Sequence, residues 1–449
     1  MTGVLGFATA IGFVGVIVGT VAVGRRVVDQ ALDHLGRRRR NQRGAVLIGS
    51  VGKRGRPVAL DLDELQQGIL IGGSPGAGKT TLLTAIEHRL PAEIGCAFVD
   101  LKGDRALGGR LGIAPERVFG LGDRVSAAFN PLDRGNPASW RDILMATQEW
   151  SEPHYRQAAA RFVGACLAAL AATDRRVELE RVIELLEQPK LATGLLRQLD
   201  EPERGALARS VALLESEASL RSGVLGLGNR LALLRDSPAT ARRFGATEGI
   251  DLEAILRGER ALFSLPAAEF PEEAPAIAAA VIQTFGAAGQ RLARGDEPLR
   301  ALLIVDEAAR LGGNQLRESV AIGRGAGIGT AVAVQDFADL DYVAAGTREA
   351  VETGANTWIV MRQVASAEQI ANAFGSQTTK RTTVQRDVHR WGFSDTGMRS
   401  EREVEEYRVS PNVIRGLGRG EAVVWRRLRG SLERVEIVPG DRRNEHDGR

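Results

Sequence analysis

One short segment restricts the possible fold of this chain more than any other: Gly73-Ser74-Pro75-Gly76-Ala77-Gly78-Lys79-Thr80. The apolar run 69–72 precedes it, and a helix-favouring segment begins at Thr81. A strand, a GxxxxGK[ST] turn and a helix in this order form a P-loop, whose backbone N–H groups point at phosphate. We therefore expect residues 73–81 to bind ATP, with Lys79 on the β- and γ-phosphates and the Thr80 hydroxyl on Mg²⁺.

A second apolar run, 301–305, ends in two acidic residues, Asp306 and Glu307. A buried strand that delivers two carboxylates at its carboxyl end is typical of a Walker B element. We expect Asp306 to hold Mg²⁺ through water and Glu307 to polarise the water that attacks ATP. The alternative, an ordinary strand that ends in charged residues, is less favoured once a P-loop stands upstream.

Further along the chain, the apolar segment 329–334 ends at Gln335. A carboxamide there can bind the γ-phosphate or the attacking water and sense whether the nucleotide is intact. Arg324, which precedes this segment, is a candidate arginine finger that a neighbouring subunit would receive. Arg362 follows the apolar run 358–361 and competes for that role.

The turn Asp100-Leu101-Lys102-Gly103-Asp104 follows another apolar run, 96–99. It is either a ligand-binding turn at the edge of an α/β sheet or a simple helix cap and turn. Both cysteines, Cys96 and Cys166, lie in apolar segments without the spacing of metal ligands. The sequence therefore predicts a reduced compartment and no structural zinc.

The N-terminal segment 3–24 contains 22 uncharged, mostly apolar residues, and Arg25 and Arg26 follow it. A helix of this length reaches about 33 Å, enough to cross a membrane. Positive residues after the apolar run indicate that the N-terminus lies outside and the rest of the chain in the cytoplasm. We expect residues 1–26 to form a single transmembrane anchor in the inner (plasma) membrane, and residues 27–44 a basic linker.

Between the P-loop and Walker B segments, residues 140–170 and 177–235 have helical periodicity. One apolar face is expected from Leu179, Val182, Ile183, Leu185 and Leu186. We interpret 131–248 as an inserted all-helical domain. The polar stretch 376–408 is either a solvated loop or hairpin or a pore-facing element that touches DNA. Strands near 421–426 and 433–438 are expected to close the sheet, and 440–449 to form a disordered tail.

The charge of the chain is unevenly distributed. Residues 25–56 contain ten Lys/Arg and two Asp, whereas the net charge of the whole chain is only +3. The remainder is therefore acidic on balance, which excludes a protein that coats DNA with its outer surface. Five lysines stand against 54 arginines, so the abundance of arginine is weak evidence for nucleic-acid binding.

The order of these motifs resembles a known family. GGSPGAGKTT, FVDLKGD, FNPLD at 129–133, the helical insert, LLIVDEAARL and GRGAGIGTAVAVQ occur in sequence. They resemble the type IV secretion system coupling proteins (TraG/TraD type) of the FtsK–HerA P-loop ATPase superfamily, over residues 45–439. In that family Lys79, Thr80, Asp306, Glu307, Gln335 and Arg324 match the Walker A, Walker B, glutamine and arginine-finger positions.

The resemblance implies an α/β, RecA-like nucleotide-binding domain, formed here by 45–130 and 249–439, that assembles as a hexameric ring. Such a ring pumps DNA or a relaxase–DNA complex into a conjugative secretion channel and contacts the membrane proteins of that channel. The inserted domain of the family faces the substrate. Two departures concern partners only: this chain has one expected span instead of two, and it has no long acidic tail.

Two other functions stay open at this point. The same fold could drive or gate protein secretion without a DNA substrate, although tandem ATPase domains would favour that and only one P-loop is found. A binding module with a degenerate ATPase is the third alternative, and the intact Lys79, Asp306 and Glu307 argue against it.

Overall fold

The computed structural model describes residues 44–52, 55–123, 126–173, 176–293, 300–321, 324–389 and 392–440. The expected transmembrane segment, nearly all of the basic linker and the tail from residue 441 lie outside these ranges. Within the described ranges, no helix combines the length and the apolar character that crossing a membrane requires.

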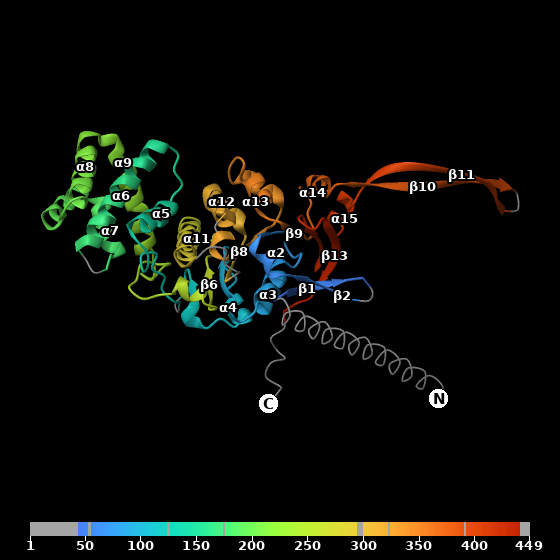
Figure 1. Cartoon of the computed structure of the whole chain (residues 1–449), viewed down its shortest axis with the longest axis horizontal. Coiled ribbons are helices and arrows are strands. Elements are labelled where there is room, and N and C mark those ends of the chain that lie inside the picture. Colours follow the sequence, from blue (N-terminus) through green and yellow to red (C-terminus); the bar gives the residue numbers. More distant parts are fainter. Residues whose placement is uncertain are drawn as a thin grey trace, which may run out of the picture.

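A mixed sheet of eleven strands runs through the described part of the chain (Figure 1). Its seven parallel strands are, in spatial order, β9 (Thr357–Val360), β3 (Ile69–Gly72), β8 (Ile328–Val334), β7 (Ala301–Asp306), β4 (Gly95–Asp100), β6 (Arg260–Ser264) and β5 (Val118–Gly120). Beyond β9 follow four antiparallel strands, β12 (Glu421–Arg426), β13 (Ser431–Ile437), β1 (Val46–Val51) and β2 (Arg56–Leu60).

Alternate residues of the central strands serve two separate hydrophobic cores. Leu70, Val99 and Leu303 belong to one core, whereas Ile71, Phe98 and Ile304 belong to the other. Because successive side chains of a strand point to opposite faces, a strand buried on both faces must be apolar throughout. This is why the three strands that carry the predicted site motifs appear in the sequence as uninterrupted apolar runs.

Helices cover both faces of this sheet. Those outside the helical block described below are α2 (Leu62–Gln66), α3 (Lys79–Arg89), α4 (Leu107–Leu111), α10 (Leu252–Ile255), α11 (Glu273–Leu292), α12 (Gly313–Ala321), α13 (Thr347–Gly354), α14 (Ala367–Phe374) and α15 (Pro411–Arg415). Helix α3 contributes Leu82 and Ile86 to one core, and α11 contributes Ile277 and Phe285 to the other. These two helices therefore lie on opposite sides of the sheet.

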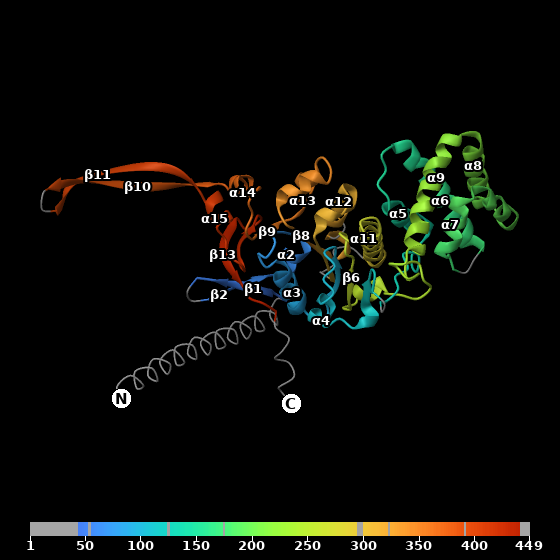
Figure 2. The same cartoon turned by 180° about the vertical axis from the view of Figure 1, so that it is seen from behind.

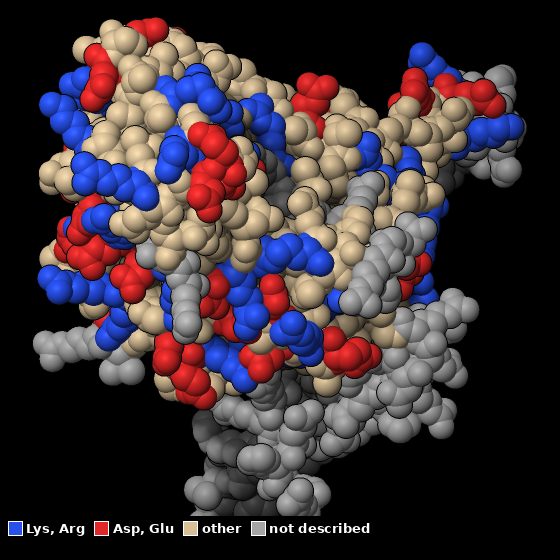
Figure 3. Space-filling model, turned by 60° about the vertical axis from the view of Figure 1, so that its left-hand side comes forward, with Lys and Arg blue, Asp and Glu red and all other residues tan. Residues whose placement is uncertain are grey.

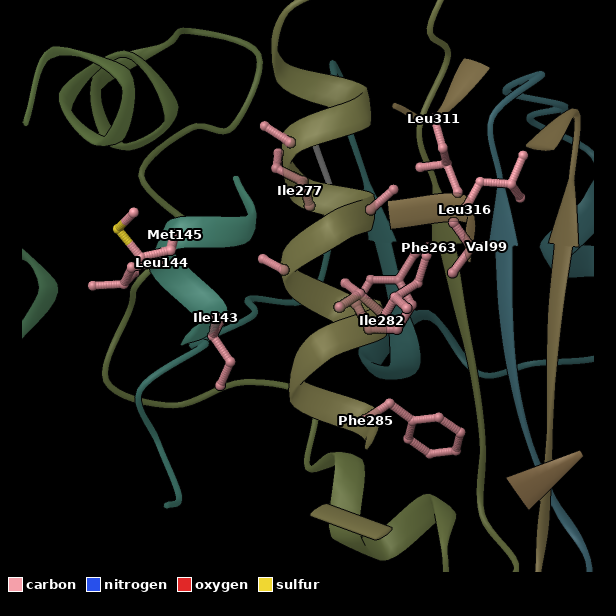
Figure 4. Packing of buried hydrophobic residues seen from close by; sticks show 14 of the residues in the cluster. Val99, Ile143, Leu144, Met145, Phe263, Ile277, Ile282, Phe285, Leu311 and Leu316 are labelled. Carbon is pink, nitrogen blue, oxygen red and sulfur yellow. The ribbon is translucent and has the colours of Figure 1, made fainter. Parts of the chain in front are cut away.

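Between β5 and β6 the chain forms a block of helices: α5 (Pro137–Ala146), α6 (Pro153–Thr173), α7 (Leu179–Glu187), α8 (Glu203–Ser216) and α9 (Ala218–Asp236). The apolar face predicted on α7 is confirmed, because all five of its residues are buried. Figure 4 shows α11 between α5, with Met145, and the sheet, with Phe263. Many residues of α11 are alanine, which lets one helix pack closely on both sides.

Two hydrogen bonds join the helical block to the segment that follows β7. The backbone N–H of Gly313 donates to Oε1 of Glu149 at 3.0 Å. The Gln315 side chain, which is buried, donates through Nε2 to the carbonyl of Ala146 at 3.0 Å. The start of α12 is thus held by the end of α5, although the two lie far apart in the sequence.

The stretch 376–408 is a β-hairpin. Strands β10 (Ser376–His389) and β11 (Gly392–Tyr407) pair only with each other and leave the body of the molecule as a long ribbon (Figure 1). Seen from behind, the ribbon and the helical block lie at opposite ends of the molecule (Figure 2).

The sequence prediction for the edge of the sheet was wrong. Strands β12 and β13 occur close to the predicted ranges, but they do not close the sheet, because β13 pairs with β1 and β1 pairs with β2. The chain segment 46–60 was not predicted as strands. Its apolar residues are interrupted by Lys53, Arg54 and Arg56, so it lacks the uninterrupted apolar run of the central strands.

A buried carboxylate on α3 pairs with an arginine at the start of β6. Replacing that arginine gives the first testable prediction. Glu87 is fully buried, and Nη1 of Arg260 donates to its Oε1 at 2.5 Å and to its carbonyl at 2.8 Å. Arg260→Leu leaves this carboxylate buried with only the His88 ring at 3.7 Å beside it, so we expect the free energy of unfolding to fall by about 3–5 kcal/mol. Urea unfolding measures the loss.

The matched control is Arg117→Leu, because the ion pair of Arg117 with Glu259 (3.1 Å) is exposed on both sides. An exposed pair contributes about 0–1 kcal/mol. Equal losses for the two variants would contradict the structural role of the Glu87–Arg260 pair.

Candidate nucleotide-binding site

The P-loop connects β3 to α3. Strand β3 ends at Gly72 and α3 begins at Lys79. Gly76 and Gly78 have φ angles of 77° and 112°, a region that side-chain-bearing residues rarely adopt. A Cβ at Gly76 would meet nothing within 4 Å, so the backbone is open to the surroundings there. The loop therefore presents its N–H groups at the N-terminus of α3, which is where phosphate binds.

Three other strands hold this loop in place. The Gly73 N–H donates to the carbonyl of Val334 at 3.2 Å, and the Ser74 N–H donates to that of Arg362 at 2.8 Å. The Ala77 carbonyl accepts from Gly420 N–H at 2.8 Å. Because these contacts come from the ends of β8 and β9 and the start of β12, the loop is preorganised by the sheet.

Lys79 is buried at the start of α3 and points back across the loop. Its Nζ donates to the carbonyl of Gly73 at 2.6 Å and lies 4.0 Å from Oε1 of Glu307. Burial lowers the pKa of Lys79, and the nearby carboxylates of Glu307 and Asp306 oppose this shift. The ammonium group thus occupies the place where negative phosphate oxygens would arrive.

The predicted Walker B residues lie at the end of β7. Asp306 is 2% exposed, and its Oδ1 accepts from the Glu307 N–H at 2.9 Å. Glu307 has a left-handed backbone with φ 55°, which turns its side chain out of the strand direction toward Lys79. Burial raises the pKa of Asp306 to about 6, with further contributions from the neighbouring Asp100 and Glu307.

Gln335 follows β8 directly and contacts the Walker B glutamate. Its Nε2 donates to Oε2 of Glu307 at 2.9 Å. Glu307 therefore lies between the ammonium of Lys79 and the carboxamide of Gln335. The structure brings together Lys79 at the start of α3, Glu307 after β7 and Gln335 after β8.

Sequence reasoning missed Gln363, which positions Gln335. Gln363 is fully buried; its Nε2 donates to the Gln335 carbonyl at 3.0 Å, and its Oε1 accepts from Phe337 N–H at 3.0 Å. A signal was present, because Gln363 lies three residues past the end of the buried strand β9, close to the edge where Gln335 follows β8. Asp336 strengthens the same link by accepting from the N–H groups of Val364 and Ala365.

Asp100, which begins the turn left open in the sequence, also lies at the site. Parallel pairing of β4 with β7 sets Asp100 level with Asp306. Its carboxylate accepts from the N–H groups of Lys102 (3.0 Å) and Asp104 (2.7 Å), so it forms the turn that the sequence analysis left open. Burial raises the pKa of Asp100 as well. Two buried carboxylates therefore adjoin the P-loop.

These residues fit a magnesium ion. The hydroxyl of Thr80, on the first turn of α3, and the buried carboxylate of Asp306 are oxygen ligands of the kind that Mg²⁺ takes. Among the described residues no group of three or more His, Cys, Asp or Glu could hold a metal ion. An ion that is bound by Thr80, by water and by phosphate oxygens requires no such group.

The two arginine candidates lie in different places. Arg324 begins the short helix η4 (Arg324–Ala326), which precedes β8. Gln335 follows the other end of β8, about 23 Å away along the strand, so the backbone of Arg324 is remote from this chain's own P-loop. Arg362 is exposed and lies beside the P-loop, where its carbonyl accepts from Ser74.

Comparison with known proteins places this geometry in context. A family model described as "TraM recognition site of TraD and TraG" matches residues 300–419. The bacterial conjugative coupling protein TrwB, solved without bound nucleotide, has 16% sequence identity and a TM-score of 0.66, covering 87% of this chain and 88% of that one. TrwB in complex with ADP and Mg²⁺ has 16% sequence identity and a TM-score of 0.65, and the match covers 88% of this chain and 90% of that one.

VirB4 of Thermoanaerobacter pseudethanolicus has 13% identity and a TM-score of 0.54, covering 88% of this chain and 96% of that one. The comparison with curated proteins gave no match. At these identities the likeness shows the fold, a large mixed α/β sheet of the RecA-like P-loop type. Together with the family model, it confirms the resemblance to TraG/TraD-type coupling proteins.

The raised pKa of Asp306 predicts that its ionised carboxylate lowers the free energy of unfolding near neutral pH. Folding raises its pKa from about 4 to about 6, so between these values the folded chain binds a proton that the unfolded chain does not. The free energy of unfolding therefore falls as pH rises through this window. In the absence of nucleotide and Mg²⁺, we expect Asp306→Asn to stabilise the fold by about 2 kcal/mol at neutral pH.

Urea unfolding at neutral pH and at a pH below this window tests the expectation, because the gain should shrink once Asp306 is protonated. Glu93→Gln, which changes an exposed carboxylate, serves as the control. A gain of the same size at both pH values would disprove the assignment.

Proposed function

We propose that this chain is a membrane-anchored, ATP-driven DNA translocase. It would act as the coupling protein that delivers DNA or a relaxase–DNA complex to a conjugative type IV secretion channel. One observation carries the ATPase part of this proposal: the Glu307 carboxylate lies 4.0 Å from the Lys79 ammonium and accepts a 2.9 Å hydrogen bond from Gln335. A carboxylate held between a P-loop lysine and a carboxamide is suited to orient a water molecule for attack on a phosphate.

Each residue of the site has a proposed part in hydrolysis. Lys79 would exchange its hydrogen bond to the Gly73 carbonyl for the β- and γ-phosphate oxygens of ATP. Glu307 would accept the proton of the attacking water, and Gln335 would hold that water or the γ-phosphate. Thr80, and Asp306 through water, would hold Mg²⁺, which would supply positive charge against the phosphates. Solved structures of TrwB with ADP and Mg²⁺ and with a non-hydrolysable ATP analogue support this choice of ligands.

The DNA part of the proposal rests on the resemblance to conjugative coupling proteins. A hexameric ring would gather basic groups from six chains in one pore, so a chain with a net charge of only +3 could track a phosphate backbone. We assign 45–130 and 249–439 to the motor domain and 131–248 to an inserted helical domain that faces the cargo. Residues 1–26 would anchor the ring in the inner membrane with the bulk of the chain in the cytoplasm, next to the channel proteins.

The nucleic-acid dependence of ATP hydrolysis tests this function directly. For the fragment 45–449 we expect a basal rate that rises when single- or double-stranded DNA is added. Glu307→Gln should still bind ATP but lower kcat by about 10²–10⁴-fold, because it removes the general base. Glu116→Gln, which alters an exposed carboxylate outside the site, should leave kcat unchanged.

The outcomes separate the alternatives. ATP hydrolysis that does not respond to either form of DNA would favour a protein-secretion motor on the same fold. Unchanged turnover in Glu307→Gln would remove the proposed base and leave the mechanism without support.

Arg324 gives a separate prediction. Because its backbone is remote from this chain's own P-loop, we propose that it serves the site of a neighbouring subunit. Arg324→Ala should leave ATP binding intact and lower kcat by about 10³-fold or more. Mixing Arg324→Ala chains with Glu307→Gln chains should restore part of the activity, since the second variant supplies the arginine to sites that keep Glu307. Arg362→Ala, at the competing candidate, is compared in the same assay. Absence of rescue in the mixture of Arg324→Ala and Glu307→Gln chains would argue against action in trans.

A further inference from the structure

A cleft of about 360 Å³ opens on the helical block where α5, α6 and α8 meet. Small residues form its floor: Ala160, Gly164 and Ala168 on α6, and Ala206 on α8. The only buried polar side chain in its lining, Ser210, is already satisfied by the carbonyl of Ala206 at 2.9 Å. The floor is therefore apolar and has room for side chains from another molecule.

Three arginines surround this floor: Arg141, Arg161 and Arg209. Arg141 lies across Gly164, since a Cβ at that glycine would stand 3.3 Å from its Cδ, and it pairs only with its neighbour Asp142. Arg161 and Arg209 are exposed, and within the described residues neither makes an ion pair. Figure 3, in which the helical end comes forward, shows Lys and Arg side chains together with Asp and Glu side chains over this end of the molecule.

Several other arginines of the same block are engaged with carboxylates. Arg176 pairs with Asp133, Arg181 with Glu184, and Arg230 with Glu272. In this cleft, by contrast, two exposed guanidinium groups without an ion pair to any described residue line an apolar floor. Guanidinium groups bind carboxylates in a planar, two-point geometry, which suits them to recognise acidic side chains.

We infer that this cleft binds an acidic peptide segment of a partner protein. The carboxylates of the segment pair with Arg161 and Arg209, and an apolar side chain between them lies on the alanine floor. Charge argues against a nucleic acid as the occupant: between residues 131 and 248 the sequence has 16 Lys/Arg and 16 Asp/Glu.

The inference does not depend on the proposed ATPase. The cleft lies on the helical block, beyond α11 from the sheet, and shares no residue with the P-loop or the Walker B strand (Figure 1). Changes in the cleft can therefore be scored against ATP hydrolysis as an independent readout of folding and assembly.

Fluorescence anisotropy with the purified full-length chain tests the inference. The probe is a short labelled peptide in which glutamate alternates with leucine, compared with the same peptide carrying lysine in place of glutamate. We expect the acidic peptide to bind, and Arg161→Ala and Arg209→Ala each to weaken binding by about tenfold, the contribution of one charge-assisted hydrogen bond.

Two further variants separate docking in the cleft from general attraction. Gly164→Leu fills the floor without changing any charge and should abolish binding. Arg156→Ala removes an exposed arginine from the same helix that does not line the cleft, and should change nothing. All four variants should keep the ATP hydrolysis rate of the parent chain.

Three results would overturn the inference: equal binding of the lysine peptide, full binding by Gly164→Leu, or unchanged affinity in both arginine variants. Short single- or double-stranded DNA that displaces the acidic peptide and loses affinity in the same variants would instead identify a phosphate-binding cleft, and would equally overturn it.

Discussion

The register of three parallel strands determines where everything in the nucleotide site lies. Gly72 of β3 is level with Val334 of β8 and with Val360 of β9, so the three strands end together at one edge of the sheet. The P-loop is held by the carbonyl groups of Val334 and Arg362 at the ends of these neighbours. Gln335 directly follows β8, and Gln363, three residues past β9, donates to its carbonyl. A slip of one residue would turn each of these side chains to the wrong face.

Several ionisable side chains are buried at the same edge of the sheet. Asp100, Asp306 and Lys79 are all buried there, which is unfavourable for each of them alone. Their mutual contacts and the backbone N–H groups of two turns compensate only in part, since burial still raises the pKa of both aspartates and lowers that of the lysine. A site in this state is ready to receive phosphate and a divalent cation, which would supply the missing counter-charges.

The sequence allowed the local features of the site to be predicted, because each depends on a short pattern. Each pattern is an apolar run followed by a Gly-rich turn, by Asp306-Glu307 or by Gln335. Such a pattern can be recognised in one segment without knowing which strands lie beside it. The proximity of Asp100 to Asp306 and the support that Gln363 gives to Gln335 depend on strand order, which no single segment encodes. The hairpin 376–407 was left open for a related reason: its sequence is mostly polar and lacks the regular alternation of apolar residues that indicates a half-buried strand.

The contacts of α12 with the helical block connect that block to the nucleotide site. The chain continues from Glu307 to α12, which begins at Gly313. The first residues of α12 form hydrogen bonds with Glu149 and with the Ala146 carbonyl at the end of α5. If the nucleotide shifts that segment, the shift changes these two hydrogen bonds and therefore acts on α5, which forms part of the cleft. Thermodynamic linkage makes this influence mutual: a molecule bound between α5, α6 and α8 must alter nucleotide affinity by the same factor by which nucleotide alters its own.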